Sequence, residues 1–184
     1  MFLKNFFFSF LVTLSLGATA VHADPALEEC SIAGPDAFFC SGKTFRQMKL
    51  DVGEGVTFWL HKTGFLSKVL VEDTNGKPVT RAQIENRIIA IVSNQAGHFG
   101  SAFSFSDLSS TTVGGVPFGT LSYELEGEET NHAVLHSYVS VKGRVLQVVS
   151  QLALAQASKD PAALAEAHAA ALRAVRIESR TSDT

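Results

Sequence analysis

The sequence predicts an α+β fold in which helices pack against a twisted antiparallel sheet. Along most of the chain, apolar residues alternate with polar ones in short runs, which is the pattern of half-buried strands. Short turns separate these runs, and strands joined by short turns pair antiparallel because parallel strands need long crossovers. Two segments instead place apolar residues three or four positions apart, which is typical of amphipathic helices.

Three strands are predicted before the first helix. The first is a short segment at 44–50, which is followed by an alternating strand at 56–61 and a third strand at 65–72. The third strand is followed by Asn75-Gly76, a pair that readily adopts the positive φ values of a tight turn.

The first helix is predicted from a capping box at its start. The hydroxyl of Thr80 can accept a hydrogen bond from the backbone of Gln83, whose side chain reaches back to Thr80. Gly97 is expected to end this helix. One apolar stripe follows the helical period and comprises Ile84, Ile88, Ile91 and Val92.

An antiparallel meander is predicted after this helix. Glycine-containing and polar turns separate its strands, which are placed at 101–107, 118–126, 132–141 and 145–154.

The last helix is predicted to begin at Asp160-Pro161, an N-cap followed by proline in the first helical position. It is expected to run to about Val175, and the cationic Arg173 and Arg176 near its end offset the helix dipole. Its predicted buried face comprises Leu164, Ala167, His168, Ala171, Leu172 and Val175.

Residues 1–23 have the features of a secretory signal peptide. Lys4 precedes an apolar run at 6–16, and small residues then lead to Ala23. A membrane-spanning anchor is the alternative, but the run is shorter than the roughly 18 to 20 apolar residues that a bilayer core requires. We therefore expect a periplasmic or secreted protein that begins near Asp24 and has no membrane span after cleavage.

The chain contains two cysteines, Cys30 and Cys40. In an oxidising compartment they are expected to form a disulfide. A redox-active pair is the alternative, although the spacing is not that of Cys-x-x-Cys. The predicted organisation is an N-terminal disulfide loop at 24–43, a single α+β domain at 44–178 and a polar tail at 179–184.

The composition disfavours nucleic acid as a partner. The formal net charge is −3, and it becomes −4 when residues 1–23, which contain one lysine and no acidic residue, are removed. Such a chain lacks the basic surface that binds a phosphate backbone. An apolar fraction of 46% with 18% charged residues is typical of globular proteins.

The C-terminal part of the chain contains the motif Val-Gly-Gly-Val-Pro-Phe-Gly at 113–119 and three strands after it. A helix follows Lys159-Asp160-Pro161, and Val175-Arg176-Ile177 closes the segment. In this order of elements the chain resembles the Mog1/PsbP-like fold family, whose members include photosystem subunits, nuclear-transport factors and exported bacterial proteins. The resemblance implies a non-enzymatic binding or accessory module, and it transfers no site residue.

Two histidines, His132 and His136, have the spacing of a helical zinc motif. The glutamate that follows the first histidine in such motifs is absent here, and the segment is predicted as a strand. In a strand the two lie about 13 Å apart, at about 3.3 Å per residue, which is too far for the pair alone to chelate one ion. We therefore expect surface or rim histidines, and we predict neither a metal site nor a cofactor.

No catalytic arrangement is predicted. Ser104 or Ser106 could join Asp107 and a histidine, but the chain has no Gly-x-Ser-x-Gly elbow. His168 is expected to be a partly buried, hydrogen-bonded side chain rather than a ligand. A solvated hairpin tip, with a calcium site as the alternative, is expected for the acidic residues Glu124, Glu126, Glu128 and Glu129.

Aromatic and histidine side chains on the predicted strands form the candidate binding surface, which comprises Trp59, His61, His132, His136 and Tyr138. For Trp59 a position at the edge of the core is the alternative. The leading hypothesis is an exported binding or accessory protein that acts through a sheet surface or a cleft between sheet and helix. Its partner would be an exported or envelope protein or a small ligand. The alternatives are a periplasmic hydrolase with a histidine-centred site and an inhibitor or immunity-type protein.

Overall fold

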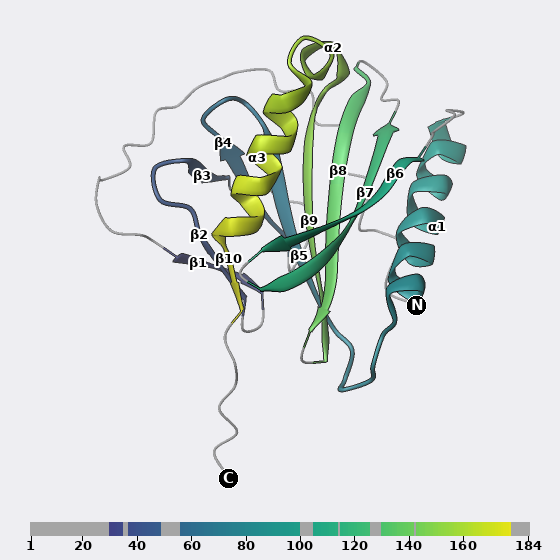
Figure 1. Ribbon diagram of the computed structural model, residues 1–184. Coiled ribbons are helices and arrows are strands. Elements are labelled where there is room, and N and C mark those ends of the chain that lie inside the picture. Colours follow the sequence, from purple (N-terminus) through teal and green to yellow (C-terminus); the bar gives the residue numbers. More distant parts are fainter. Residues whose placement is uncertain are drawn as a thin grey trace.

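The computed structural model describes residues 30–34, 37–48, 56–99, 105–113, 115–125, 130–141 and 143–177, with the backbone alone for 95–99 and 105–109. Its main strands are β3 (Phe45–Met48), β4 (Val56–His61), β5 (Leu66–Asp73), β6 (Phe105–Val113), β7 (Val116–Leu125), β8 (His132–Val141) and β9 (Arg144–Ala153). They form a seven-stranded sheet in the order β3-β4-β5-β9-β8-β7-β6, in which every neighbouring pair is antiparallel (Figure 1). The predicted α+β fold with an antiparallel sheet is confirmed.

Strand bounds agree with the prediction best where apolar alternation is strong. β4 and β8 begin and end at the predicted residues. β6 instead continues to Val113, beyond the predicted end at Asp107, through a serine- and threonine-rich run that lacks apolar alternation. Among the described strands it is an edge strand that pairs only with β7, so its backbone bonds specify it more than its side chains do.

Helices α1 (Arg81–Phe99) and α3 (Pro161–Ala174) cover opposite faces of this sheet (Figure 1). Ser137 and Tyr138 are consecutive residues of β8, so their side chains point to opposite faces. The Ser137 hydroxyl is hydrogen-bonded to His168 of α3, whereas the Tyr138 hydroxyl donates to Glu85 of α1. The central strands therefore bury side chains on both faces, an α3 face and an α1 face.

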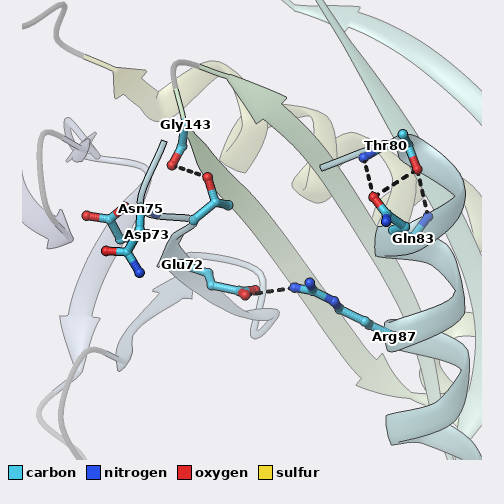
Figure 2. Close-up of polar contacts among 8 residues, drawn as sticks. Glu72, Asp73, Asn75, Thr80, Gln83, Arg87 and Gly143 are labelled. Atoms are coloured by element: carbon cyan, nitrogen blue, oxygen red, sulfur yellow. Dashed lines mark hydrogen bonds and ion pairs between the residues drawn. The ribbon is translucent and has the colours of Figure 1, made fainter. Parts of the chain in front are cut away.

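Both long helices begin with the predicted caps. The backbone N–H of Thr80 donates to Gln83 Oε1 at 2.9 Å and the Gln83 N–H donates to Thr80 Oγ1 at 3.3 Å, which is the reciprocal capping box (Figure 2). Asp160 accepts from the N–H of Ala163 before Pro161. The first helix passes the predicted end at Gly97 and reaches Phe99.

The start of the described chain forms a second, three-stranded sheet. Strands β1 (Cys30–Gly34) and β2 (Ala37–Cys40) make an antiparallel hairpin where a loop was expected, and β10 (Val175–Ile177) pairs with β2. Cys30 lies opposite Cys40 and the two form a disulfide. A short helix, α2 (Leu154–Ala157), connects β9 to α3.

The core has a part on each face of the seven-stranded sheet. On the α3 face, side chains of the hairpin, of β3, β4 and β5 and of α3 pack together, among them Phe39, Phe45, Trp59, Val69 and Leu172. On the α1 face, Ile84, Ile88 and Val92 of the predicted helical stripe pack on Leu121, Tyr123, Val134, Tyr138 and Val149. Within the described ranges no helix is long and apolar enough to cross a membrane.

Two turns at one end of the sheet are tied together. Asn75 and Gly76 have φ values of 52° and 74°, as the Asn-Gly pair predicts. Thr74, just before them, donates both its hydroxyl, at 2.6 Å, and its N–H, at 3.0 Å, to the carbonyl of Gly143 in the turn between β8 and β9. These bonds fix the loop that leads from β5 into α1.

Candidate functional site

A row of buried hydroxyls crosses the α3 face, and we call it the α3-side cluster. It comprises Ser67, Ser150, Ser137, Thr120 and His168, all at most 7% exposed. Ser67 lies directly opposite Ser150, and Thr120 lies directly opposite Ser137, with hydroxyl oxygens 2.8 Å and 2.7 Å apart. His168 bridges the two pairs, with Nδ1 2.9 Å from Ser150 Oγ and Nε2 2.8 Å from Ser137 Oγ.

The local sequence explains this row. Each hydroxyl-bearing residue occupies an inward position of an alternating strand, where an apolar residue is usual. His168 lies in the buried stripe of α3. A buried polar group is destabilising unless it is hydrogen-bonded, and here each member has a partner within the row. His168 is hydrogen-bonded as predicted, and with 4% exposure it is fully rather than partly buried.

The α3-side cluster fixes helix to sheet instead of presenting a nucleophile. Burial lowers the pKa of His168 to about 4, so the imidazole is neutral at pH 7, with one ring nitrogen donating and the other accepting. Both nitrogens already face serine hydroxyls, so no carboxylate orients the ring as in a catalytic triad. The arrangement joins α3 to β8 and β9.

A second group of polar side chains lies on the α1 face, and we call it the α1-side cluster. It comprises Lys68, Tyr123, His136, Tyr138, Gln147, Arg81 and Glu85. At its centre, His136 Nδ1 lies 3.2 Å from the Tyr123 hydroxyl, and Nε2 lies 2.9 Å from Gln147 Oε1. With Gln147 Oε1 accepting from Nε2–H, Nδ1 is left to accept from the phenol.

Burial sets the protonation of this cluster. It lowers the pKa of His136 to about 3, with the nearby Lys68 charge as a second cause. Burial also lowers the pKa of Lys68 to about 8 and raises the pKa of Tyr123. His136 is therefore neutral at physiological pH.

Helix α1 contributes the outer part of the α1-side cluster. Tyr138 donates its hydroxyl to Glu85, and Arg81 forms an ion pair with the same carboxylate at 2.7 Å and lies 6.0 Å from the Tyr138 ring centroid. Burial and the hydrogen bond to Glu85 raise the pKa of Tyr138 to about 12. Gly119 of β7 lies directly opposite Tyr138 and leaves room for its ring, since a Cβ at position 119 would overlap the phenol.

This cluster reaches the surface. Gln147 is half-buried, and the side chain of Arg81 is 51% exposed. Nearby, Arg87 of α1 and Glu72 of β5 form an exposed ion pair with a nitrogen–oxygen distance of 2.7 Å, which spans the space between helix and sheet (Figure 2). The α1 face thus has a buried polar centre and a rim of exposed charges, namely Arg81, Arg87 and Glu72.

The five residues of the predicted binding surface are divided between the two faces of the sheet. Trp59 and His61 lie on the α3 face, where they are 0% and 7% exposed, whereas His132, His136 and Tyr138 lie on the α1 face. His136 is 3% exposed and so is not a surface or rim histidine, and His132 is half-buried. The five therefore do not form one exposed surface, because the β4 residues share one face and the β8 residues share the other, as the strand register sets them.

Several sequence candidates lie beyond what the structure describes. This holds for Ser104, for the side chains of Ser106 and Asp107, and for Glu126, Glu128 and Glu129, whereas Glu124 is exposed. Among the described side chains, no group of three histidine, cysteine or acidic residues is placed to hold a metal ion. Sequence reasoning missed Lys68, Tyr123, Gln147 and the serines, and polar residues inside otherwise apolar strands are the signal that could have revealed them.

No family model and no curated protein sequence matches the chain. Among solved structures, PsbP from the cyanobacterium Synechocystis sp. is 10% identical with a TM-score of 0.56, and the match covers 87% of this chain and 99% of that protein. A protein of Bacteroides thetaiotaomicron matches with 6% identity and a TM-score of 0.50 over 84% of this chain and 50% of its own. LpqN of Mycobacterium tuberculosis matches with 13% identity and a TM-score of 0.44 over 86% and 88%. The chain has the PsbP-like fold that its sequence resembles.

Proposed function

We propose that this protein is an exported accessory or binding protein that holds another exported or envelope protein through the α1 face of its sheet. The observation that carries the proposal is the convergence of polar side chains from four strands and α1 in the α1-side cluster, which reaches the surface at Arg81. On the same face of the sheet, Glu72 and Arg87 form a separate exposed ion pair. Buried polar and titratable groups cluster at functional sites more often than elsewhere.

The opposite face offers less to a partner. The α3-side cluster is enclosed between helix and sheet, with every member at most 7% exposed. The hairpin covers the neighbouring aromatic residues on the same face. On the α1 face a partner meets the exposed Arg81, Glu72 and Arg87 and the half-buried Gln147, because the other strand residues of the α1-side cluster are at most 5% exposed. These exposed charges would steer association and fix orientation.

The fold supports an accessory role by analogy. The solved structure with a TM-score of 0.56 is that of a PsbP, and the family resemblance implies a non-enzymatic binding or accessory module. Fold alone does not assign function, so the proposal depends on the α1-side cluster.

The test compares two sets of arginine substitutions. Arg81→Ala with Arg87→Ala removes the rim cations of the α1 face, and Arg173→Ala with Arg176→Ala removes exposed arginines of α3 and β10, away from that face. Exposed ion pairs contribute about 0 to 1 kcal/mol, so both variants should fold. Cross-linking in the exported fraction should capture a specific partner with the wild type and the control variant, and lose it with the α1-face variant.

Two results would contradict the proposal. Equal capture by both variants would place the interaction elsewhere on the molecule. Esterase or peptidase activity of the purified protein that His136→Gln abolishes would favour the hydrolase hypothesis, in which the same cluster performs chemistry.

A further inference from the structure

The β1–β2 hairpin covers the single tryptophan of the chain. Phe39 of β2 stacks on Trp59 of β4, with ring centroids 4.2 Å apart and 22° between the ring planes. Phe45 of β3 meets the Phe39 ring edge-on at 5.1 Å. Both Phe39 and Trp59 have no solvent exposure. Displacement of the hairpin would therefore bring Trp59 into contact with water.

Few backbone hydrogen bonds hold the hairpin over Trp59. In the described part of the chain, the hairpin pairs with β10 and not with the seven-stranded sheet. Packing adds to this pairing, and at Gly34 a Cβ would lie 2.6 Å from Val71 Cγ2 of β5. An isolated two-stranded hairpin is marginally stable in water. The Cys30–Cys40 disulfide at the open end of the hairpin therefore supplies much of its closure.

The disulfide lies on the outer face of the hairpin. Alternation places Cys30 and Cys40 on the same side as Ile32 and Phe38, opposite the buried Phe39. Cys30 and Ile32 are exposed, and Cys40 is half-buried. A thiolate can thus reach the disulfide from solvent without first opening the core.

The covered state also leaves one polar group unsatisfied. The indole Nε1 of Trp59 is buried and has no hydrogen-bond acceptor among the described residues. Water would supply an acceptor once the hairpin moved away. This group therefore favours the uncovered state, and it opposes the apolar packing that favours closure.

We propose that the Cys30–Cys40 disulfide is a redox latch that controls exposure of the aromatic surface around Trp59. A dithiol reductant donates two electrons and two protons, so the sulfur–sulfur bond breaks to two thiols while the dithiol becomes a disulfide. The reduced hairpin then moves off Trp59 and Phe45, and the seven-stranded sheet stays folded. Reoxidation closes the hairpin again.

The single tryptophan makes this testable by fluorescence. The oxidised protein is titrated with dithiothreitol while thiol content, Trp59 emission, acrylamide quenching and far-UV circular dichroism are followed. We expect two thiols per chain, a red shift of the emission, and a quenching constant that rises about threefold or more, as for local opening of a cover segment. The far-UV spectrum should keep its sheet signal.

Variants distinguish a disulfide that controls the exposure of Trp59 from one that only stabilises the fold. Cys30→Ser with Cys40→Ser should show the reduced-state fluorescence without dithiothreitol and should not respond to it. Phe39→Ala should raise quenching in the oxidised protein, whereas the matched outward substitution Phe38→Ala should not. Release of two thiols with Trp59 still shielded would overturn the proposal. Simultaneous loss of shielding and of the far-UV signal would also overturn it, because it would mean global unfolding.

Discussion

At the scale of single residues, the absence of a side chain at Gly119 makes room for the Tyr138 ring in the α1-side cluster. Gly119 on β7 lies directly opposite Tyr138 on β8, and the tyrosine ring occupies the space that a Cβ at position 119 would need. This placement lets the Tyr138 hydroxyl reach Glu85 on α1. A glycine in a central strand normally weakens it, and here the ring lying over it compensates.

We therefore expect Gly119→Ala to lower the free energy of unfolding by about 1 to 3 kcal/mol, the range for overpacking a core. In a Tyr138→Leu background the same substitution should cost much less, because the obstructing ring is gone. Urea denaturation of the two single variants and the double variant measures the coupling. Additive effects would mean that the ring does not limit the size of residue 119.

The buried histidines make stability depend on pH. Burial lowers the pKa of His168 from 6.5 to about 4, so between these pH values the unfolded chain binds a proton that the folded chain does not. Stability therefore falls as the pH falls through this window, and His168 has no such effect above it. At about 1.4 kcal/mol per pKa unit, the loss from His168 reaches about 3 kcal/mol near pH 4.

This loss is measured by urea denaturation at pH 7, 5 and 4 for the wild type and for His168→Gln. The variant should be less stable at pH 7 because it loses bonds to Ser137 and Ser150, but its stability should fall less steeply toward pH 4. His136 titrates in both proteins, so the difference between them reports His168. Equal slopes would show that His168 keeps an ordinary pKa.

At the scale of elements, α3 is specified by its own sequence and held by what it covers. Asp160 caps it, Pro161 starts it, and its apolar stripe meets the α3 face of the sheet. Its last turn runs directly into β10, which pairs with the hairpin. Helix, hairpin and disulfide are thus mechanically connected.

Neighbouring residues of α3 should respond very differently to truncation. Leu172 is 2% exposed within the core, so Leu172→Ala should cost about 2 to 4 kcal/mol. Arg173 is exposed, so Arg173→Ala should cost well under 1 kcal/mol. Chemical denaturation of both variants measures this contrast. Similarly small losses at the two positions would show that the helix does not dock on the sheet.

At the scale of the whole molecule, one large sheet separates two differently built faces. The α3 face is covered by a helix and a small second sheet and contains the enclosed hydroxyl row. In the described part of the chain the α1 face is covered by α1, and its polar cluster reaches the surface at Arg81. The proposed partner surface lies on the α1 face. The aromatic surface that the proposed redox latch would expose lies on the α3 face.

The remaining prediction concerns the chain as it leaves the cytoplasm. The charge and apolar run of residues 1–23 should direct export, with cleavage leaving Asp24 at the N-terminus. Intact-mass measurement of the exported protein tests this. Exported material that retains Met1 to Ala23 would contradict the assignment of a signal peptide.

The sequence alone determined the fold class, most strand positions and both helix caps, because these depend on local periodicity and on hydrogen bonds within a few residues. The bounds of β4 and β8, the Thr80–Gln83 box and the Asp160 cap could all be predicted. The hairpin at Cys30–Cys40 could not, since its strands are held by pairing with β10 and by packing on Trp59 from distant parts of the chain.

Only the tertiary structure decided which polar residues meet. The row from Ser67 to Thr120 depends on strand register and on the angle at which α3 crosses the sheet, neither of which is set by local sequence. For the same reason the proposed surface of Trp59, His61, His132, His136 and Tyr138 was divided between two faces. The alternation of side chains within a strand follows from the local sequence. Which side of a strand faces α1 and which faces α3 is decided by the packing of the whole sheet.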